Sequence, residues 1–280
     1  MIRRVIDDDL DLRKIADSGQ CFRWTVQDER TVRIIAAGRC LYAVDLGGGA
    51  FAFDCDDAGF ADLWHGYFDL DEDYAAIRGR IDPAADPFLW RAAEHGKGIR
   101  ILRQDPWETL VSFIISQNRN IPAIRRSVEL LCEMCGTRKT DARGGPFFAF
   151  PEPERIAALS EDDLKACKLG YRWRYVREAA RTVLRGGIDL PALSRRPCSE
   201  AVEALCALDG VGPKVAGCVA LFGLHQPDAF PRDVWINRVL RNEYPGGFPF
   251  DRYSPYNGVY QQYMFAYYRD PGSGTRDPGR

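Results

Sequence analysis

The segment LDGVGPKVAGCVALFGLHQPDAFPRDVWIN, residues 208–237, indicates how the middle of the chain folds. Gly210 and Gly212 bracket an apolar valine, and Pro213 is suited to the first position of a helix. The glycines allow a tight turn whose N–H groups, together with the positive end of the following helix dipole, can hold a phosphate. The segment therefore predicts a helical hairpin, residues 199–223, that grips a nucleic-acid backbone without reading its sequence.

Lys214 lies in the first turn of the second hairpin helix, and Asp233 follows it in the same segment. Asp233 directly precedes VWINRVL, so it is placed to cap a further helix. Lysine is scarce in this chain, because only six of the 38 basic residues are lysines. A lysine and a carboxylate that can converge indicate amine chemistry.

The composition is that of a globular protein without an overall basic charge. The chain has 280 residues, of which 46% are hydrophobic, enough for a buried core. Its formal net charge is −2 and its pI is about 6.0, so any contact with DNA must be made by a local patch. There is no apolar run of membrane-spanning length, and we expect no membrane contact.

Nine cysteines, an odd number without a signal peptide, favour a reducing compartment. We expect a cytoplasmic protein, associated with the nucleoid if the organism is a prokaryote. Cys132 and Cys135 form a C-x-x-C pair, but their spacing also suits packing on one helix face, and we favour packing over metal binding or redox chemistry. No cysteine follows Cys218, which excludes a four-cysteine iron–sulfur cluster near the C-terminus. We expect no metal and no cofactor.

The pattern of hydrophobic residues divides the chain into a sheet part and a helical part. Alternating runs at 31–37, 40–46 and 50–56, separated by glycine turns, predict antiparallel strands. Helical periodicity begins near residue 57. The sequence therefore predicts an α+β fold: an N-terminal antiparallel β-sheet domain with flanking helices, then a mostly α-helical domain containing the helix-hairpin-helix motif. The predicted bounds are 1–97, 98–270 and a disordered tail at 271–280.

The run RQDPWETLVSFIISQ, residues 103–117, predicts a central buried helix. Asp105 is suited to the N-cap, Pro106 to the first helical position, and Glu108 to the capping box. The helix ends in QNRNIP, residues 117–122, where polar side chains either simply turn the chain or offer donors at one spot; we weigh these two interpretations equally. Residues 136–152 predict a Gly- and Pro-rich loop between helices.

Two further segments mix aromatic and basic residues. GYRWRY, residues 170–175, has a composition suited to stacking on bases and pairing with phosphates, but equally to a helix start with aromatics in the core. SGQCFRW, residues 18–24, is by composition a strand that follows a glycine turn.

Taken together, these segments resemble the 8-oxoguanine DNA glycosylase/lyases, the Ogg group of the helix-hairpin-helix-GPD superfamily. The resemblance covers most of the chain and is carried by SGQCFRW, ILRQDPWETLVSFIISQNRNI, LGYRWRYV, LDGVGPKVAGCVALF, FPRDVW and GVYQQYMF. It implies a base-excision-repair enzyme that flips 8-oxoguanine out of duplex DNA, removes it and cuts the strand through a Schiff base. A monomer that binds double-stranded DNA containing 8-oxoguanine is expected.

The resemblance also implies roles for individual residues. Lys214 is the implied nucleophile, and Asp233 assists at the sugar. Gly19 supplies a main-chain carbonyl to the N7–H that distinguishes 8-oxoguanine from guanine. The other residues implied for the flipped base are Cys218 and Phe265, which sandwich it, and Gln261, which bonds its Watson–Crick edge.

On the DNA side, the resemblance implies that Asn118 fills the space left in the duplex. Tyr171 wedges at the opposite base, and Arg172 contacts that base. The remaining DNA-binding residues are Arg119 in the polar loop and Gly210 and Gly212 in the hairpin. The chain departs from the family pattern at Arg119, at Ala123, where an arginine that reads the opposite cytosine is usual, and at Trp235, where histidine is usual.

Two other functions compete with this one. The first is a glycosylase of the same superfamily that acts on another damaged base. The absence of cluster cysteines argues against oxidised pyrimidines as substrates, and the presence of Lys214 argues against alkylated purines. A noncatalytic helix-hairpin-helix DNA-binding protein would use Lys214 only as a phosphate contact and Asp233 only as a helix cap.

Overall fold

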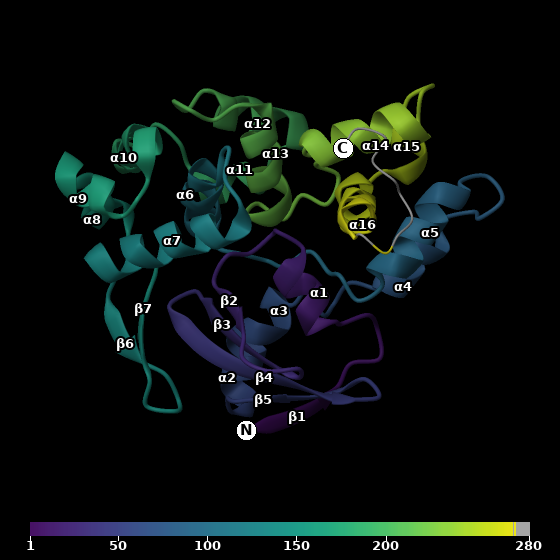
Figure 1. Cartoon of the computed structure of the whole chain (residues 1–280), viewed down its shortest axis with the longest axis horizontal. Coiled ribbons are helices and arrows are strands. Elements are labelled where there is room, and N and C mark those ends of the chain that lie inside the picture. The colour runs from purple at the N-terminus through teal and green to yellow at the C-terminus, as the bar shows by residue number, and fades with distance from the viewer. Residues whose placement is uncertain (271, 273–280) are drawn as a thin grey trace.

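The computed structural model describes residues 1–270 and 272 and shows an antiparallel sheet followed by a mostly helical part (Figure 1). The predicted α+β fold class is confirmed. The disordered tail predicted at 271–280 lies outside the described residues, apart from Gly272. No helix in the described part of the chain is both long and apolar enough to span a bilayer.

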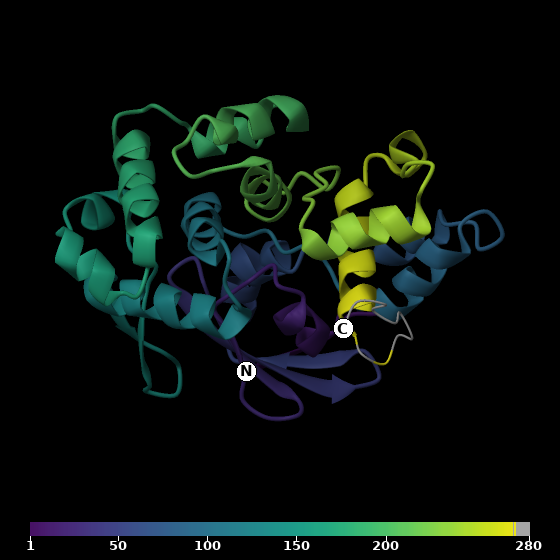
Figure 2. The same ribbon diagram turned by 45° about the horizontal axis from the view of Figure 1, so that its top comes forward.

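The sheet has five antiparallel strands in the order β1-β5-β4-β3-β2. Ile34 pairs with Trp24 on one neighbouring strand and with Leu41 on the other, which places apolar side chains of three strands on one face. Helices pack on that face, and α1 lies between the sheet and the helical part in both views (Figure 1; Figure 2). The bounds are β1 (Ile2–Val5), α1 (Leu12–Asp17), β2 (Trp24–Val26), β3 (Thr31–Ala36), β4 (Arg39–Gly47) and β5 (Ala50–Phe53).

Short helices lead from the sheet to the second part of the chain. They are α2 (Asp57–Gly59), the π-helix η1 (Phe60–Trp64), α3 (His65–Tyr67), α4 (Tyr74–Gly79) and α5 (Pro87–Gly96). Helix α5 packs closely on the last helix, α16 (Asn257–Arg269), because Gly96 has no side chain at the point where the ring of Tyr263 approaches. The domain boundary at residue 97 stays a prediction, and α4 and α5 contribute to the same core as the later helices.

Helix α6 (Pro106–Ser116) begins as predicted, with Asp105 accepting a hydrogen bond from the N–H of Glu108 at 2.7 Å. Its residues 109–116 are all buried, which makes it the central helix of this part. Helix α7 (Ile121–Cys135) follows, with Asn120 as its N-cap. Cys132 is buried in the core and Cys135 is half-buried, both as free thiols.

A small hairpin, β6 (Arg138–Thr140) and β7 (Pro146–Phe148), occupies the segment that the sequence predicted as a plain loop. Asp141 in its turn accepts hydrogen bonds from Tyr42 Oη at 3.0 Å and from the N–H of Gly145 at 2.8 Å. It also pairs with Arg33 of the sheet. These long-range contacts, which have no local sequence signature, order the hairpin.

The remaining helices complete the second part. They are α8 (Pro153–Ala157), α9 (Glu161–Ala166), the 3₁₀-helix η2 (Gly170–Arg172), α10 (Trp173–Leu184), α11 (Leu190–Leu193), α12 (Cys198–Cys206), α13 (Pro213–Phe222), α14 (Val234–Glu243) and α15 (Phe250–Tyr253). The predicted hairpin is formed by α12 and α13.

Candidate active site

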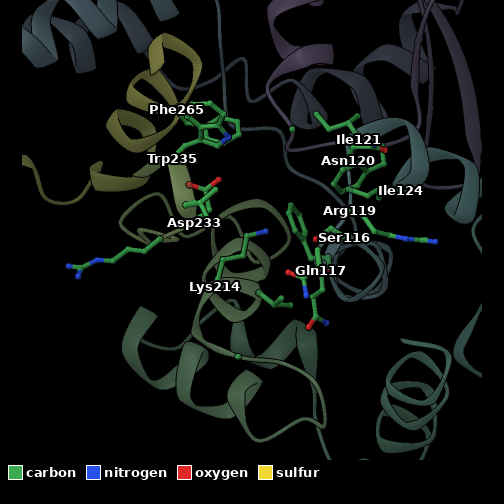
Figure 3. Close-up of a pocket in the computed structure, with 18 of the residues that line it drawn as sticks. Ser116, Gln117, Arg119, Asn120, Ile121, Ile124, Lys214, Asp233, Trp235 and Phe265 are labelled. Atoms are coloured by element: carbon green, nitrogen blue, oxygen red, sulfur yellow. The ribbon is translucent and has the colours of Figure 1, made fainter. Parts of the chain in front are cut away.

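A pocket of about 800 Å³ opens between the start of α13, the start of α14, the loop joining α6 to α7, and the end of α16. Lys214, Asp233 and Phe265 all line it, and the side chain of Arg119 extends away from it (Figure 3). The pocket collects residues that are far apart in sequence. Its lining includes seven of the residues proposed from the sequence: Gly19, Asn118, Arg119, Gly212, Lys214, Asp233 and Phe265.

The hairpin turn depends on Gly210. Its φ of +76° lies in the left-handed region, and a Cβ there would come within 2.3 Å of the Tyr175 ring. Gly212 has extended backbone and forms the N-cap of α13, with Pro213 next. Gln117 Nε2 donates to the carbonyl of Gly210 at 3.0 Å, which ties the α6–α7 loop to the turn.

Lys214 is half-buried in the first turn of α13, with its Nζ 5.2 Å from the centroid of the Phe113 ring. Phe113 is itself held between Phe22 and Phe222. One turn further along α13, burial raises the pKa of the Cys218 thiol to about 11, an effect that Lys214 opposes and Asp233 reinforces. The thiol is therefore protonated at neutral pH, and the amine lies in a largely apolar setting.

Asp233 caps α14, as predicted, because its Oδ1 accepts a hydrogen bond from the N–H of Ile236 at 2.8 Å. This bond fixes the carboxylate at the N-terminus of α14. Within the described part of the chain, Asp233 forms no ion pair with Lys214. The two side chains thus border one pocket without neutralising each other.

Gly217 brings Asp233 close to α13. A Cβ on Gly217 would lie 3.1 Å from the Cα of Pro231, so only glycine lets the Pro231–Asp233 segment pass this close to the helix. The sequence reasoning missed this residue. The signal was present, because a glycine inside an apolar helix usually marks a close approach.

Four residues were proposed to hold a flipped base, and the structure places only two of them on the pocket surface. Gly19, with a φ of +77°, and Phe265 line the pocket side by side. Cys218 and Gln261 are buried behind the lining residues. Gln261 Nε2 donates to the carbonyl of Pro231 at 3.0 Å, and its Oε1 accepts from Gln262 at 3.0 Å, so its amide group is already oriented.

SGQCFRW combines structural and pocket residues, and its strand β2 begins only at Trp24. Gln20 bonds the main chain of Arg100 and Leu102, and Arg23 pairs with Glu129 at 2.7 Å. Its aromatic and polar residues therefore hold the two parts of the chain together, while the turn at Gly19 reaches the pocket.

The proposed DNA-facing residues form a cluster around Gln117. Asn118, with a φ of +50°, donates from Nδ2 to Tyr171 Oη at 3.4 Å. Tyr171 is 51% exposed, and the guanidinium of Arg172 lies 4.4 Å from its ring centroid. Arg172 is buried and donates from Nε to the carbonyl of Gln117 at 2.8 Å. The polar loop thus both turns the chain and presents side chains.

Arg119 folds back onto the protein. Its Nη1 donates to Ser127 Oγ at 2.7 Å, and its Nη2 donates to the carbonyl of Lys168. Burial, together with the nearby charge of Arg172, lowers the pKa of Arg119. Two guanidinium groups therefore lie near each other beside the pocket.

Two family models match successive parts of the chain. The model for "8-oxoguanine DNA glycosylase, N-terminal domain" matches residues 4–110, and the model for "HhH-GPD superfamily base excision DNA repair protein" matches residues 111–245. The N-glycosylase/DNA lyase OGG1 of Arabidopsis thaliana is 38% identical over 161 residues, which are 56% of this chain and 44% of that protein. The chain thus matches about half the length of such relatives.

Solved structures match over nearly the whole chain. MBOgg1, in complex with a low-affinity DNA ligand, is 37% identical, with a TM-score of 0.87 over 94% of this chain and 93% of that one. The 8-oxoguanine glycosylase/lyase of Clostridium acetobutylicum, in complex with double-stranded DNA containing cytosine opposite 8-oxoG, is 32% identical. Its TM-score is also 0.87, over 94% of this chain and 92% of that one.

Proposed function

The chain belongs to the 8-oxoguanine DNA glycosylase family of the HhH-GPD superfamily, and we propose that it removes 8-oxoguanine from duplex DNA and then cuts the strand. The observation that carries this proposal is the shared pocket of Lys214 and Asp233 at the hairpin turn. A phosphate-gripping turn next to an amine positions that amine at the sugar of an extruded nucleotide.

Lys214 is the nucleophile of the proposed reaction. Its neutral amine attacks C1′ of the extruded nucleotide, and the bond between C1′ and the base breaks, so that the base leaves with the bonding electrons and takes up a proton. One proton of the amine goes to the departing base and the other to the ring oxygen, as the C1′–O4′ bond breaks and a Schiff base forms. A proton then leaves C2′, and the 3′ phosphate leaves as the new double bond forms.

Asp233 stabilises the positive charge that develops at C1′ as the base departs. Its Oδ1 accepts the hydrogen bond from the N–H of Ile236, which holds the carboxylate in place. A fixed negative charge at the sugar supports electrostatic assistance rather than proton uptake from the amine.

The base site proposed for this enzyme lies on the Gly19–Phe265 side of the pocket. Phe265 and the protonated Cys218 form its two walls, the carbonyl of Gly19 accepts the N7–H, and Gln261 bonds the Watson–Crick edge. The contact between Gln261 and the Pro231 carbonyl supports this role, because it orients the amide before the base arrives.

The duplex is held by the hairpin turn and by the cluster around Gln117. Gly210 and Gly212 shape the turn that grips the backbone, Asn118 fills the space of the extruded nucleotide, and Tyr171 and Arg172 meet the opposite base. The contact between Asn118 and Tyr171 supports this arrangement, because it brings the two wedge residues together. Arg119, beside Arg172, adds a second positive charge to the residues proposed to bind DNA.

We place the protein in the cytoplasm as a monomer, associated with the nucleoid in a prokaryotic cell. Its nine free cysteines support a reducing compartment.

The test is single-turnover cleavage of matched duplexes that carry 8-oxoguanine, an oxidised pyrimidine, an alkylated purine or undamaged guanine, with each of the four bases opposite the lesion. We expect cleavage of the 8-oxoguanine strand to be the fastest. Faster release of another lesion would assign a different substrate within the superfamily, and binding without release of any base would leave a noncatalytic DNA-binding protein.

A further inference from the structure

Arg269 lies at the edge of the pocket next to Gly19, and the proposed function gives it no role. It is the last residue of α16, one turn after Phe265, and its guanidinium lies 4.9 Å from the Phe265 ring centroid. Its Nη1 donates to the carbonyl of Asp17 at 3.3 Å and lies 4.0 Å from the point where a Cβ on Gly19 would stand. Arg269, Phe265 and Gly19 all line the pocket. Arg269 is exposed to solvent, and its N–H donors adjoin the carbonyl of Gly19 that is proposed to read the base.

The chemistry of the damaged base explains why a donor belongs at this corner. 8-Oxoguanine differs from guanine at two adjacent atoms, because N7 carries a hydrogen and C8 carries an oxygen. A main-chain carbonyl can accept a hydrogen bond from N7–H, but it has no donor for the oxygen on C8. A guanidinium has five N–H donors and no acceptor, so it complements a carbonyl oxygen.

We propose that Arg269 determines specificity by donating a hydrogen bond to the C8 oxygen of the extruded base while the carbonyl of Gly19 accepts its N7–H. This inference rests on the proposed function. The Phe265 ring and the Asp17 carbonyl hold the guanidinium at the pocket corner before the base arrives. Guanine presents a C–H at the same place and leaves the donor without that acceptor, which disfavours the undamaged base.

Two other roles for Arg269 predict different results. An arginine in the last turn of a helix stabilises the helix through its dipole, and an arginine at the rim of a DNA site can contact a backbone phosphate. Either role is independent of the atom attached to C8 of the base.

The experiment uses Arg269→Met, which keeps an unbranched side chain over Phe265 and removes all donors. Wild type and variant are compared in single-turnover reactions on duplexes that contain 8-oxoguanine, 8-thioguanine or a preformed abasic site. 8-Thioguanine retains the N7–H but presents sulfur, a weak acceptor. The matched control is Arg80→Met, because Arg80 also lies over a ring, that of Tyr256 at 5.2 Å, and donates to a main-chain carbonyl, that of Ser254 at 2.9 Å, away from the pocket.

We expect Arg269→Met to slow release of 8-oxoguanine about tenfold, the effect of losing one hydrogen bond from a charged donor. Release of 8-thioguanine should slow much less, and abasic-site cleavage and the Arg80→Met variant should stay at wild-type rates. Equal slowing on both bases would overturn the proposal, and equal slowing on the abasic site would assign Arg269 to the backbone or to folding. If the wild type did not release 8-oxoguanine at all, the proposed function itself would fail.

Discussion

The two sides of the pocket are built in different ways. The side that bears Lys214 and Asp233 comes from one segment, residues 208–237, in which a turn, a helix and a cap follow one another. The side that bears Gly19 and Phe265 is assembled from the two ends of the chain, which α1 and α16 bring together. Chemistry at the sugar thus depends on local structure, whereas recognition of the base depends on packing between distant segments.

The difference predicts that substitutions on the first side impair the reaction on every substrate, whereas substitutions on the second side impair only steps that involve the base. A preformed abasic site, which has no base, separates the two sides.

Asp233→Asn should have the largest effect of these predictions. Loss of the charge at the sugar is expected to slow base release about a hundredfold or more, as for other preorganised electrostatic groups. Asparagine remains a good N-cap, so folding and lesion binding should be retained. Single-turnover rates and equilibrium binding to an 8-oxoguanine duplex check this, and an unchanged rate would remove the catalytic role of Asp233.

Gly210→Ala should destabilise the fold by about 2–3 kcal/mol, because the new methyl group meets the Tyr175 ring at a left-handed backbone position. Gly186→Ala is the matched control, since Gly186 has a φ of +69° with no atom near the position of its Cβ. Urea unfolding of both variants measures the difference. Equal stability losses would mean that contact with Tyr175 does not shape the turn.

Gly217→Ala should slow the reaction about three- to tenfold by shifting the segment that bears Asp233 by a few tenths of an ångström. Stability should change little, because alanine favours the helix by about 1 kcal/mol and offsets the contact with Pro231. The rate should fall on the 8-oxoguanine duplex. Gly79→Ala, in α4 with open space around it, is the control, and identical rates for both variants would show that the close approach is not needed.

Gly19→Ala should have the smallest effect and act on one substrate only. Alanine strains the backbone at a φ of +77° and shifts the carbonyl, which we expect to slow 8-oxoguanine release about twofold while abasic-site cleavage is unchanged. Gly48→Ala, at a φ of +62° in an open turn of the sheet, controls for backbone strain. Slower abasic-site cleavage would contradict the division between the two sides.

The difference between local structure and packing of distant segments also explains which features could be predicted from the sequence. The hairpin, the Asp105 and Asp233 caps and the strands at residues 31–53 follow from local patterns, and all were predicted. The β6–β7 hairpin was missed, because contacts of Asp141 with the sheet order it. Arg269 was missed too, because only the packing of α16 beside the Gly19 turn brings it to the pocket.

Gln117 organises the DNA-facing cluster, although no sequence pattern indicated this role. The polar loop was recognised as a group of donors, but the junction that Gln117 forms was not. Its side chain holds the carbonyl of Gly210, and its own carbonyl holds Arg172. These bonds join three segments that the sequence presents separately, so their meeting point required the structure.

The most direct test of the central claim is to trap the enzyme on an 8-oxoguanine duplex with sodium borohydride, which reduces a Schiff base to a stable amine. We predict a covalent adduct with the wild type and with Lys165→Gln, a control on the surface of α9, and none with Lys214→Gln. Peptide mapping should locate the adduct at Lys214. An adduct that survives Lys214→Gln, or base release by the wild type without any adduct, would contradict the account.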